Sequence, residues 1–546
     1  MIAPSDPLLR VLGLSVQAVD RRGNASLIVD DVSYDLQRGE VLGLIGESGA
    51  GKSTVGLAAL GFARRGCELV RGSEFFHGRD IRQMPATERR QLRGAKIAYI
   101  AQSAAAAFNP AKTLMEQVIE TVAFHGLMPV DQAQMDAIAL FDALGLPHPQ
   151  SFGNAYPHQV SGGQLQRAMA AMAMMANPDI LIFDEPTTAL DVTTQVEVLA
   201  AFRNLIRQKH TAALYVSHDL AVVAQIADHI MVLRHGKVVE SGTAARILQS
   251  PQQDYTRRLV RERASPTEFR KQPDAAPPVL TITRMDANYT KASRTLRDIN
   301  LTIGMGETFA IVGESGSGKS TLARAITGLL PRATGDIAFL GETLPPRLAQ
   351  RSKRQLQMLQ MVTQMPDTAL NPHQSVLDVI GRPMAFYFNH SPAIVRARAI
   401  ELLAQMDLPE SFLHRRTGEL SGGQKQRVCI ARALAAEPKL IICDEVTSAL
   451  DPLIGEEIMQ LLQRLQQTTG IAYIFITHDL GIVRRMAHKV AVMLKGEIIT
   501  QGTIAQIFSP PFHPYTEKLL TSVPQMRADW LDDVLANRVT SQLQTP

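Results

Sequence analysis

The chain has 546 residues, and because single domains usually hold about 100–200 residues, this length indicates more than one folding unit. Its 56 Lys and Arg residues against 52 Asp and Glu residues give a net charge of +4, without the basic excess of a dedicated nucleic-acid binder. Hydrophobic residues at 45% exclude disorder as the main state. Three cysteines are too few for a disulfide framework or a four-cysteine metal site, and they favour a reducing compartment.

The N-terminus, MIAPSDPLLR, lacks the basic region and apolar stretch of a secretory signal, so we expect none. The most apolar helical candidate, residues 168–176, is too short to span a bilayer. We therefore expect a chain that is soluble by itself and reaches a membrane only through partners.

Four motifs recur in the two halves of the chain. GESGAGKST at residues 46–54 recurs as GESGSGKST at 313–321, and VSGGQLQR at 160–167 recurs as LSGGQKQR at 420–427. ILIFDEPTTALD at 180–191 recurs as LIICDEVTSALD at 440–451, and the HDL of His218 recurs at His478. This repeat predicts two full domains, residues 1–260 and 280–546, joined by a charged linker with several prolines at 261–279.

Each half alternates apolar runs typical of buried strands with helical segments. The predicted strands include residues 41–45, 180–183 and 214–216 in the first half, and 308–312, 440–443 and 474–476 in the second. This alternation predicts an α/β fold with a parallel sheet in each half. The segments between Gln102 and Ser161, and between Gln364 and Ser421, look mainly helical and suggest an inserted helical subdomain.

Each GxxxxGK[ST] motif follows a predicted strand and opens a predicted helix, the context in which this motif binds phosphate. Its glycines let backbone N–H groups close around the phosphates, Lys52 or Lys319 reaches the terminal phosphates, and Ser53 or Ser320 places a hydroxyl on Mg²⁺. The alternative is a Gly-rich turn with a surface lysine and no phosphate binding. Two matches within one repeat argue against this alternative. The phosphate-binding candidates are Gly46, Ser48, Gly49, Gly51, Lys52, Ser53, Thr54, Gly313, Ser315, Gly316, Gly318, Lys319, Ser320 and Thr321.

An acidic pair follows a buried strand in both halves, Asp184-Glu185 and Asp444-Glu445. Such a pair is costly unless a cation meets it, and Mg²⁺ on the P-loop serine would supply that cation for the first acid. The second acid of each pair can polarise the water molecule that attacks the terminal phosphate. A lone histidine at a strand end is usually structural, and only the matching places of His218 and His478 favour a phosphate contact.

Together these motifs resemble the ABC ATPases over essentially the whole chain, with Ser-Gly-Gly-Gln as the signature loop. The resemblance implies two P-loop NTPase domains in tandem, each with a parallel-sheet core, a small antiparallel β subdomain and a helical subdomain. It also implies a head-to-tail pseudo-dimer in which each ATP lies between the P-loop of one half and the signature of the other.

Carried over by position, the resemblance assigns the residues of two composite ATP sites. One site would use Lys52, Ser53, Gln102, Asp184, Glu185 and His218 with Ser421, Gly422, Gly423, Gln424 and Asp451. The other would use Lys319, Ser320, Gln364, Asp444, Glu445 and His478 with Ser161, Gly162, Gly163, Gln164 and Asp191. The catalytic residues would be Glu185, Glu445, His218 and His478, and Mg²⁺ would be held by Ser53, Gln102, Asp184, Ser320, Gln364 and Asp444.

Local features narrow the resemblance to the ATP-binding subunits of bacterial oligopeptide, dipeptide and nickel importers. They are the tails at residues 250–260 and 509–520, the Asn-Pro pairs at 109–110 and 371–372, and Tyr-Pro-His at 156–158. This resemblance implies ATP-driven import, most of all of peptides, with two integral-membrane permeases and an extracytoplasmic solute-binding protein as partners. It places the chain at the cytoplasmic face of the bacterial inner membrane, without nucleic acid. An iron–sulfur cluster, held by a Cys-rich tail in some relatives, is not expected.

Other two-ATPase proteins are alternatives. A tandem sugar-importer ATPase has a similar length, but its second half commonly departs from the motifs, and here both halves are intact. A soluble ABC translation factor acting on ribosomes would have a longer, strongly charged helical linker, whereas the linker here is short and broken by prolines. A DNA-repair ATPase would need long heptads or zinc cysteines.

The two halves differ where ABC ATPases stack adenine on an aromatic residue. Tyr289 fits this position in the second half, whereas residues 16–24 of the first half hold no aromatic and offer only Arg21 or Arg22 for a cation–π contact. Val446 stands where the first half has Pro186, and we expect little effect from that change.

We therefore predict weaker adenine contact at the first site. Titration of the isolated halves with a fluorescent nucleotide measures this directly, and equal affinity of the two halves would refute it.

Overall fold

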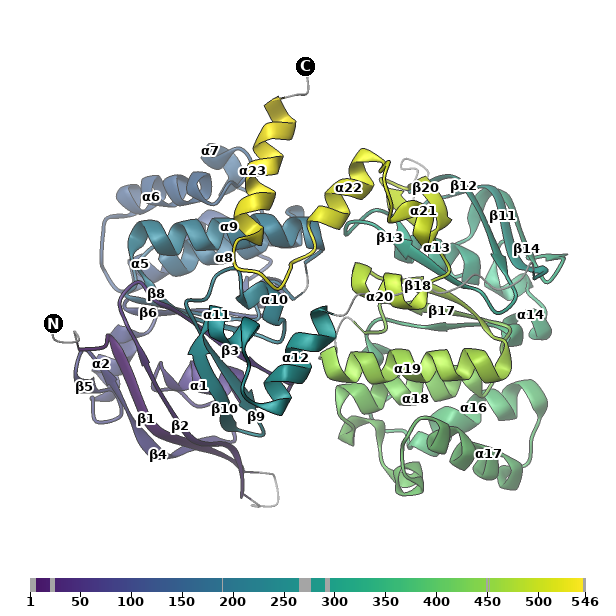
Figure 1. Ribbon diagram of the computed structural model, residues 1–546, viewed down its shortest axis with the longest axis horizontal. Coiled ribbons are helices and arrows are strands. Elements are labelled where there is room, and N and C mark those ends of the chain that lie inside the picture. The colour runs from purple at the N-terminus through teal and green to yellow at the C-terminus, as the bar shows by residue number, and fades with distance from the viewer. Residues whose placement is uncertain are drawn as a thin grey trace. The chain divides into compact units, whose positions relative to one another are not determined.

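The computed structural model describes residues 6–19, 25–188, 190–264, 276–289, 295–447, 450 and 452–543. The chain divides into two compact units, one of Met1–Ser265 with Pro524–Pro546 and one of Pro266–Val523 (Figure 1). The boundary between Ser265 and Pro266 falls within the predicted linker. The boundary between Val523 and Pro524 differs from the sequence-based division, which gave all of residues 280–546 to one domain. The C-terminal segment joins the first unit because Leu531, fully buried, also donates its backbone N–H to Gln225 of that unit.

The main sheet of the first unit has six strands in the order β10-β9-β3-β8-β7-β6, all parallel except β10. The strands are β3 (Val41–Gly46), β6 (Ile97–Ile100), β7 (Ile180–Asp184), β8 (Ala212–Ser217), β9 (His229–Arg234) and β10 (Lys237–Thr243). The strands predicted from apolar runs are confirmed. Strands β3, β7 and β8 are buried along their whole length, which explains why their sequences are continuous apolar runs.

A smaller antiparallel sheet covers the helix that follows the first P-loop. Its order is β2-β1-β4-β5, with β1 (Leu9–Val19), β2 (Ala25–Leu36), β4 (Cys67–Phe76) and β5 (Arg79–Asp80). Val55 of helix α1 (Lys52–Ala58) shares one hydrophobic core with Leu14 of β1 and Leu214 of β8. Burial from both sides thus holds α1, and with it the end of the P-loop, in place.

The remaining described elements of the first unit are a 3-10 turn at Pro157–Gln159 and a set of α-helices. They are α2 (Ala86–Leu92), α3 (Ala104–Ala107), α4 (Leu114–Val118), α5 (Glu120–Phe124), α6 (Val130–Ala143), α7 (Pro149–Phe152), α8 (Gly162–Met174), α9 (Val192–Lys209), α10 (Leu220–Val223), α11 (Ala244–Gln249), α12 (Asp254–Ala264) and α23 (Trp530–Leu543). The expected helical segment is present as α3 to α7. In Figure 1 the C-terminal helix α23 lies against α9.

The second unit repeats this plan. Its main sheet, β16-β17-β18-β13-β19-β20, is parallel except for β20, and its antiparallel sheet is β12-β11-β14-β15. The strands are β11 (Pro278–Ala287), β12 (Leu296–Gly304), β13 (Thr308–Val312), β14 (Arg332–Phe339), β15 (Glu342–Thr343), β16 (Leu359–Val362), β17 (Leu440–Asp444), β18 (Ala472–Ile476), β19 (Lys489–Leu494) and β20 (Glu497–Thr503). The predicted α/β class, with antiparallel and helical subdomains, is confirmed in both units.

The helices of the second unit follow the same order as those of the first. They are α13 (Lys319–Thr327), α14 (Lys353–Met358), α15 (Pro366–Ala369), α16 (Val376–Phe388), α17 (Pro392–Gln405), α18 (Gly422–Leu434), α19 (Pro452–Thr469), α20 (Leu480–Met486), α21 (Ile504–Ile507) and α22 (Pro514–Thr521). Helices α16 to α19 enclose one apolar core, which includes Ile380, Leu403, Ile430 and Ile458. Across the described residues, no helix combines the length and apolarity needed to cross a membrane.

Candidate functional site

The first P-loop holds its lysine inside the loop. Lys52 is only 5% exposed, and its Nζ donates to the backbone oxygens of Gly46 at 2.8 Å and Glu47 at 2.9 Å. Gly49 and Gly51 have φ angles of 81° and 96°, in the left-handed region that glycine enters without strain. A loop of this conformation presents successive backbone N–H groups, an arrangement that can bind phosphate groups.

The second P-loop has the same geometry. Lys319 donates from Nζ to the backbone oxygens of Gly313 and Glu314, at 2.8 Å each. Gly316 and Gly318 adopt φ angles of 79° and 109°. The other predicted P-loop residues lie in the same loops and in the first turns of α1 and α13: Ser48, Ser53, Thr54, Ser315, Ser320 and Thr321.

In each half the P-loop serine contacts the acid at the end of a neighbouring strand. Ser53 donates from Oγ to Asp184 Oδ1 at 2.6 Å, and Ser320 donates to Asp444 Oδ1 at 3.1 Å. A hydroxyl and a carboxylate are hard oxygen ligands of the kind that Mg²⁺ prefers. The residues present therefore fit a magnesium ion, and the serine and the aspartate of each predicted set of three lie together, whereas Gln102 and Gln364 contact the neighbouring glutamates.

The predicted glutamine and histidine both contact the second acid of each pair. Glu185 Oε2 accepts from Gln102 Nε2 at 3.1 Å and lies 3.2 Å from His218 Nδ1. In the second half the equivalent contacts join Gln364, Glu445 and His478, with distances of 2.6 Å and 3.4 Å. Both glutamates have a φ angle of 49°, so the backbone bends sharply where each strand ends.

The electrostatics keep the first catalytic candidate charged. Burial by itself raises the pKa of Glu185, but the hydrogen bond and charge of His218, together with the charge of Lys52, bring it below its ordinary value. Burial by itself lowers the pKa of His478, and its contact with Glu445 outweighs this and leaves that pKa raised. An ionised carboxylate beside a histidine can orient and polarise a water molecule.

The signature loops begin helices α8 and α18 through capping boxes. Ser161 Oγ accepts from the backbone N–H of Gln164 at 3.3 Å, and Gln164 Oε1 accepts from the backbone N–H of Ser161 at 2.9 Å. Ser421 and Gln424 make the same pair of hydrogen bonds at 3.4 Å and 3.0 Å. The intervening glycines, Gly162, Gly163, Gly422 and Gly423, form the first turns of these helices.

The signature helix of the first half packs closely against the helix that begins at Asp191. A Cβ atom on Gly163 would lie 2.2 Å from Thr194 Cγ2 of α9, so only glycine fits there. Asp191 caps α9, because its Oδ1 accepts from the backbone N–H of Thr194 at 3.0 Å. Its predicted counterpart Asp451 lies outside the described residues.

Tyr289, the predicted adenine contact of the second half, lies beside the helix that follows the second P-loop. Its side chain is 53% exposed, and its hydroxyl accepts a hydrogen bond at 3.0 Å from Arg324 Nη1 of α13, the helix that follows the second P-loop. Arg21 and Arg22, the candidates for the first half, lie outside the described residues.

Sequence reasoning missed two residues that contact Asp184. Tyr99 donates from its hydroxyl to Asp184 Oδ2 at 2.6 Å, and Arg64 Nη2 lies 3.5 Å from the same oxygen. At the matching sequence positions, counted from Gln364 and Lys319, the second half has Met361 and Pro331. Neither of these side chains can make the corresponding contact. There burial raises the pKa of Asp444, although the hydrogen bond from Ser320 opposes it. The two acids therefore have different surroundings.

The pairing of strands β6 and β7 explains why Tyr99 was missed. Tyr99 lies opposite Ile182 of β7 in the sheet, which brings its side chain within reach of Asp184 at the strand end. A tyrosine in a short apolar strand is an ordinary core residue by sequence, and only the order of the strands gives it this contact.

Comparisons with known proteins agree with this geometry. A family model described as "ABC transporter" matches residues 29–188 and 296–448, and one described as "Oligopeptide/dipeptide transporter, C-terminal region" matches residues 500–546. The "Glutathione import ATP-binding protein GsiA" of Shigella dysenteriae serotype 1 (strain Sd197) is 37% identical over 540 residues, covering 91% of this chain and 86% of that protein. The protein of the same name from Escherichia coli (strain K12) is 37% identical over 541 residues, with the same coverage.

Among solved structures, cbiO1 from Clostridium perfringens, part of the ABC transporter complex cbiONQ, matches with a TM-score of 0.39 and 33% identity. The match covers 43% of this chain and 91% of that one.

The fold and the paired sites define a tandem ATPase of the ABC class, since each unit unites the P-loop, both strand-end acids and a signature helix. The chain belongs to the ABC transporter family, and its C-terminal region is that of the oligopeptide/dipeptide transporters. The C-terminal match favours this group over the sugar-importer and translation-factor alternatives.

The contact between Tyr99 and Asp184 predicts a stability difference that calorimetry can measure. Tyr99→Phe removes a hydrogen bond to a carboxylate and should lower the free energy of unfolding of the first unit by about 1.5–3 kcal/mol. Met361→Leu, at the matching place in the second half, is the control and should change unfolding little. An unchanged unfolding profile for Tyr99→Phe would contradict the contact.

Proposed function

We propose that this chain hydrolyses ATP to drive the import of a peptide-type solute through two membrane permease subunits. The observation that carries the proposal is the match of residues 500–546 to the C-terminal region of oligopeptide/dipeptide transporters. The relatives named above as glutathione import proteins support the same direction of transport and the same broad class of solute. An extracytoplasmic binding protein would deliver the solute, and the ATPase would act at the cytoplasmic face of the inner membrane.

ATP would bind at two composite sites, each with the P-loop of one half and the signature of the other. The matching P-loop geometry of the two halves supports two phosphate sites. The capping boxes at Ser161 and Ser421 support a second contribution, because each leaves a signature loop at the N-terminal, positive end of a helix. Closure of the two halves around ATP would then add positive potential next to the terminal phosphate.

Within each site, Glu185 or Glu445 would hold and polarise the attacking water. The lowered pKa of Glu185 keeps it ionised near neutral pH, as this role requires. Gln102 and His218 contact the same carboxylate and would keep it oriented toward the water. Magnesium, held by Ser53, Gln102 and Asp184 or by Ser320, Gln364 and Asp444, would neutralise phosphate charge.

The permeases would dock on exposed apolar side chains of the two units. In the first unit Phe124 of α5 is 72% exposed, and Leu127 just beyond it is 49% exposed. In the second unit Met365, the residue after Gln364, is 59% exposed, and Phe386 of α16 is 57% exposed. Exposed large apolar side chains in the helical segments and next to Gln364 suit the burial of a partner helix.

The catalytic assignment predicts the behaviour of a double variant. Glu185→Gln combined with Glu445→Gln should keep ATP binding and lower turnover by at least about 100-fold, because the water loses both of its carboxylates. Phosphate release and binding of a fluorescent nucleotide measure the two effects separately. Undiminished hydrolysis would refute the assignment, and unequal single variants would show that the two sites differ.

The docking surface predicts a separation of binding from chemistry. Phe124→Asp and Phe386→Asp should weaken co-purification with the permeases and leave the ATPase activity of the isolated chain unchanged, because neither residue lies in the ATP sites. Leu12→Asp, which changes a 48% exposed leucine of the antiparallel sheet, is the matched control. Unchanged capture of permeases by both variants would contradict the docking surface.

A further inference from the structure

The C-terminal segment, residues 524–543, is bonded to the first unit through a buried glutamine. Gln225, 3% exposed, donates from Nε2 to the backbone oxygens of Gln525 and Arg527, at 2.9 Å each. Its Oε1 accepts from the backbone N–H of Leu531 at 3.1 Å. Trp530 is 1% exposed. Gln225 Nε2 also donates to the backbone oxygen of Ala221 at 3.0 Å, so this one amide joins the segment to the first unit through both its donor and its acceptor atoms.

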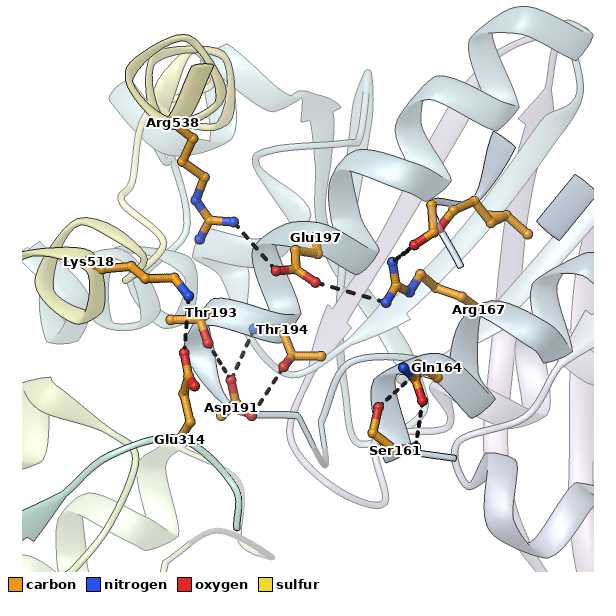
Figure 2. A network of polar contacts seen from close by, with 12 residues as sticks. Ser161, Gln164, Arg167, Asp191, Thr193, Thr194, Glu197, Glu314, Lys518 and Arg538 are labelled. Atoms are coloured by element: carbon orange, nitrogen blue, oxygen red, sulfur yellow. Dashed lines mark hydrogen bonds and ion pairs between the residues drawn. The ribbon is translucent and has the colours of Figure 1, made fainter. Parts of the chain in front are cut away.

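Ion pairs attach the same segment to the helix α9. Arg203 of α9, 5% exposed, forms a two-bonded ion pair with Asp532. One turn and a half before it, Glu197 lies between Arg538 of α23, at 4.0 Å, and Arg167 of the signature helix α8, at 3.9 Å (Figure 2). The Glu197 pairs are long and Glu197 itself is 48% exposed, so the Arg203 pair and Gln225 supply most of the attachment.

The elements held in this way carry the functional loops of the first half. Helix α9 begins at Asp191, α8 begins at the signature Ser161, and Gln225 follows α10, which begins just after His218. Figure 2 shows Asp191, Ser161 and Glu197 in this region of the first unit. The C-terminal segment therefore supports α9, which begins at Asp191, and through Glu197 also α8, which begins at the signature loop.

Helix α22, which precedes the segment in the chain, contacts the second P-loop. Tyr515 of α22 accepts at its hydroxyl from the backbone N–H of Glu314 at 3.1 Å, and Lys518 pairs with the Glu314 side chain at 3.3 Å. Ser522, which ends α22, is fully buried. Only Val523 and Pro524 separate Ser522 from Gln525. The Cα atoms of Ser522 and Gln525 can therefore lie at most about 11 Å apart.

The second half differs at the matching places. Gln463 and Arg485 stand where the first half has Arg203 and Gln225, and Arg485 is paired with Glu456 at 2.6 Å. Beside the second signature loop, Glu457, the match of Glu197, lines an open pocket of about 500 Å³. At these matched positions the second half therefore lacks the groups with which the first half binds the C-terminal segment.

We propose that residues 524–543, which we call the strap, are a positioning element for one of the two ATP sites. The strap links the P-loop of the second half, through α22, to the signature and Asp191 helices of the first half. These are the two components of a single composite site, so this inference rests on the proposed function. Through its covalent connection to α22, the strap would limit how far these components can separate and so favour ATP binding at that site, whereas the other site has no such link through the strap.

The chain's single tryptophan, Trp530, reports whether the strap is docked. In the full chain we expect a blue-shifted emission and weak quenching by acrylamide, as for a buried indole. Gln225→Ala should shift the emission to the red and raise the quenching constant several-fold. Arg485→Ala, the matched change in the second half, should do neither. Quenching of the unmodified chain as strong as that of a free tryptophan derivative would overturn the docking.

The effect on ATP binding is measured one P-loop at a time in the hydrolysis-deficient double glutamine variant. Lys52→Ala leaves the second P-loop as the binding site, and Lys319→Ala leaves the first. Ending the chain at Val523 should weaken a fluorescent ATP analogue about five- to tenfold in the Lys52→Ala background and less than about twofold in the Lys319→Ala background. Gln225→Ala in the full chain should act in the same direction. Equal effects in the two backgrounds, or none, would overturn the proposal.

A signature variant separates failure of the strap from failure of the composite site. Ser161→Arg in the Lys52→Ala background, with the strap intact, should weaken binding at the second P-loop. If it does so while truncation does not, the strap proposal is wrong and the composite site stands. If Ser161→Arg has no effect, the composite site itself is wrong.

Discussion

Each half of this protein is organised around a buried lysine. Lys52 and Lys319 are 5% and 7% exposed, and a cation in such a place is costly unless oxygen atoms surround it. The P-loop supplies two backbone oxygens to each lysine, and Glu185 adds a negative charge 3.9 Å from Lys52. The left-handed glycines and the burial of α1 between two sheets serve this arrangement. A γ-phosphate would replace part of that compensation.

The same constraint explains why the acids stand where they do. Asp184 and Glu185 end a strand that is buried on both faces, so their charges must be met at the edge of the sheet by Ser53, Lys52 and His218. The second half solves the problem with the same residue types, but without counterparts of Tyr99 and Arg64. Duplication has therefore kept the chemistry and allowed the surroundings of the two sites to diverge.

The sequence was a good guide to the main sheets and to the local contacts of each site. Strands such as β7 and β17 are continuous apolar runs because both faces are buried, and this pattern is readable without a structure. The antiparallel sheets were expected only from the family resemblance, since their strands are half-exposed and bulged. The contact of Tyr99 with Asp184 was missed because it depends on which strand lies beside β7.

The sequence by itself determined the duplicated ATPase chemistry, because a P-loop, a strand-end acid pair and a signature loop are short motifs whose function follows from local backbone and residue type. Only the tertiary structure decided where the C-terminal segment belongs. Its attachment to the first unit depends on Gln225 and Arg203, about 300 residues earlier in the chain, and no local pattern links them to Leu531 and Asp532. Contacts between residues so distant in sequence arise only when the burial of Trp530 and the hydrogen bonds of Gln225 can be satisfied together in the folded chain.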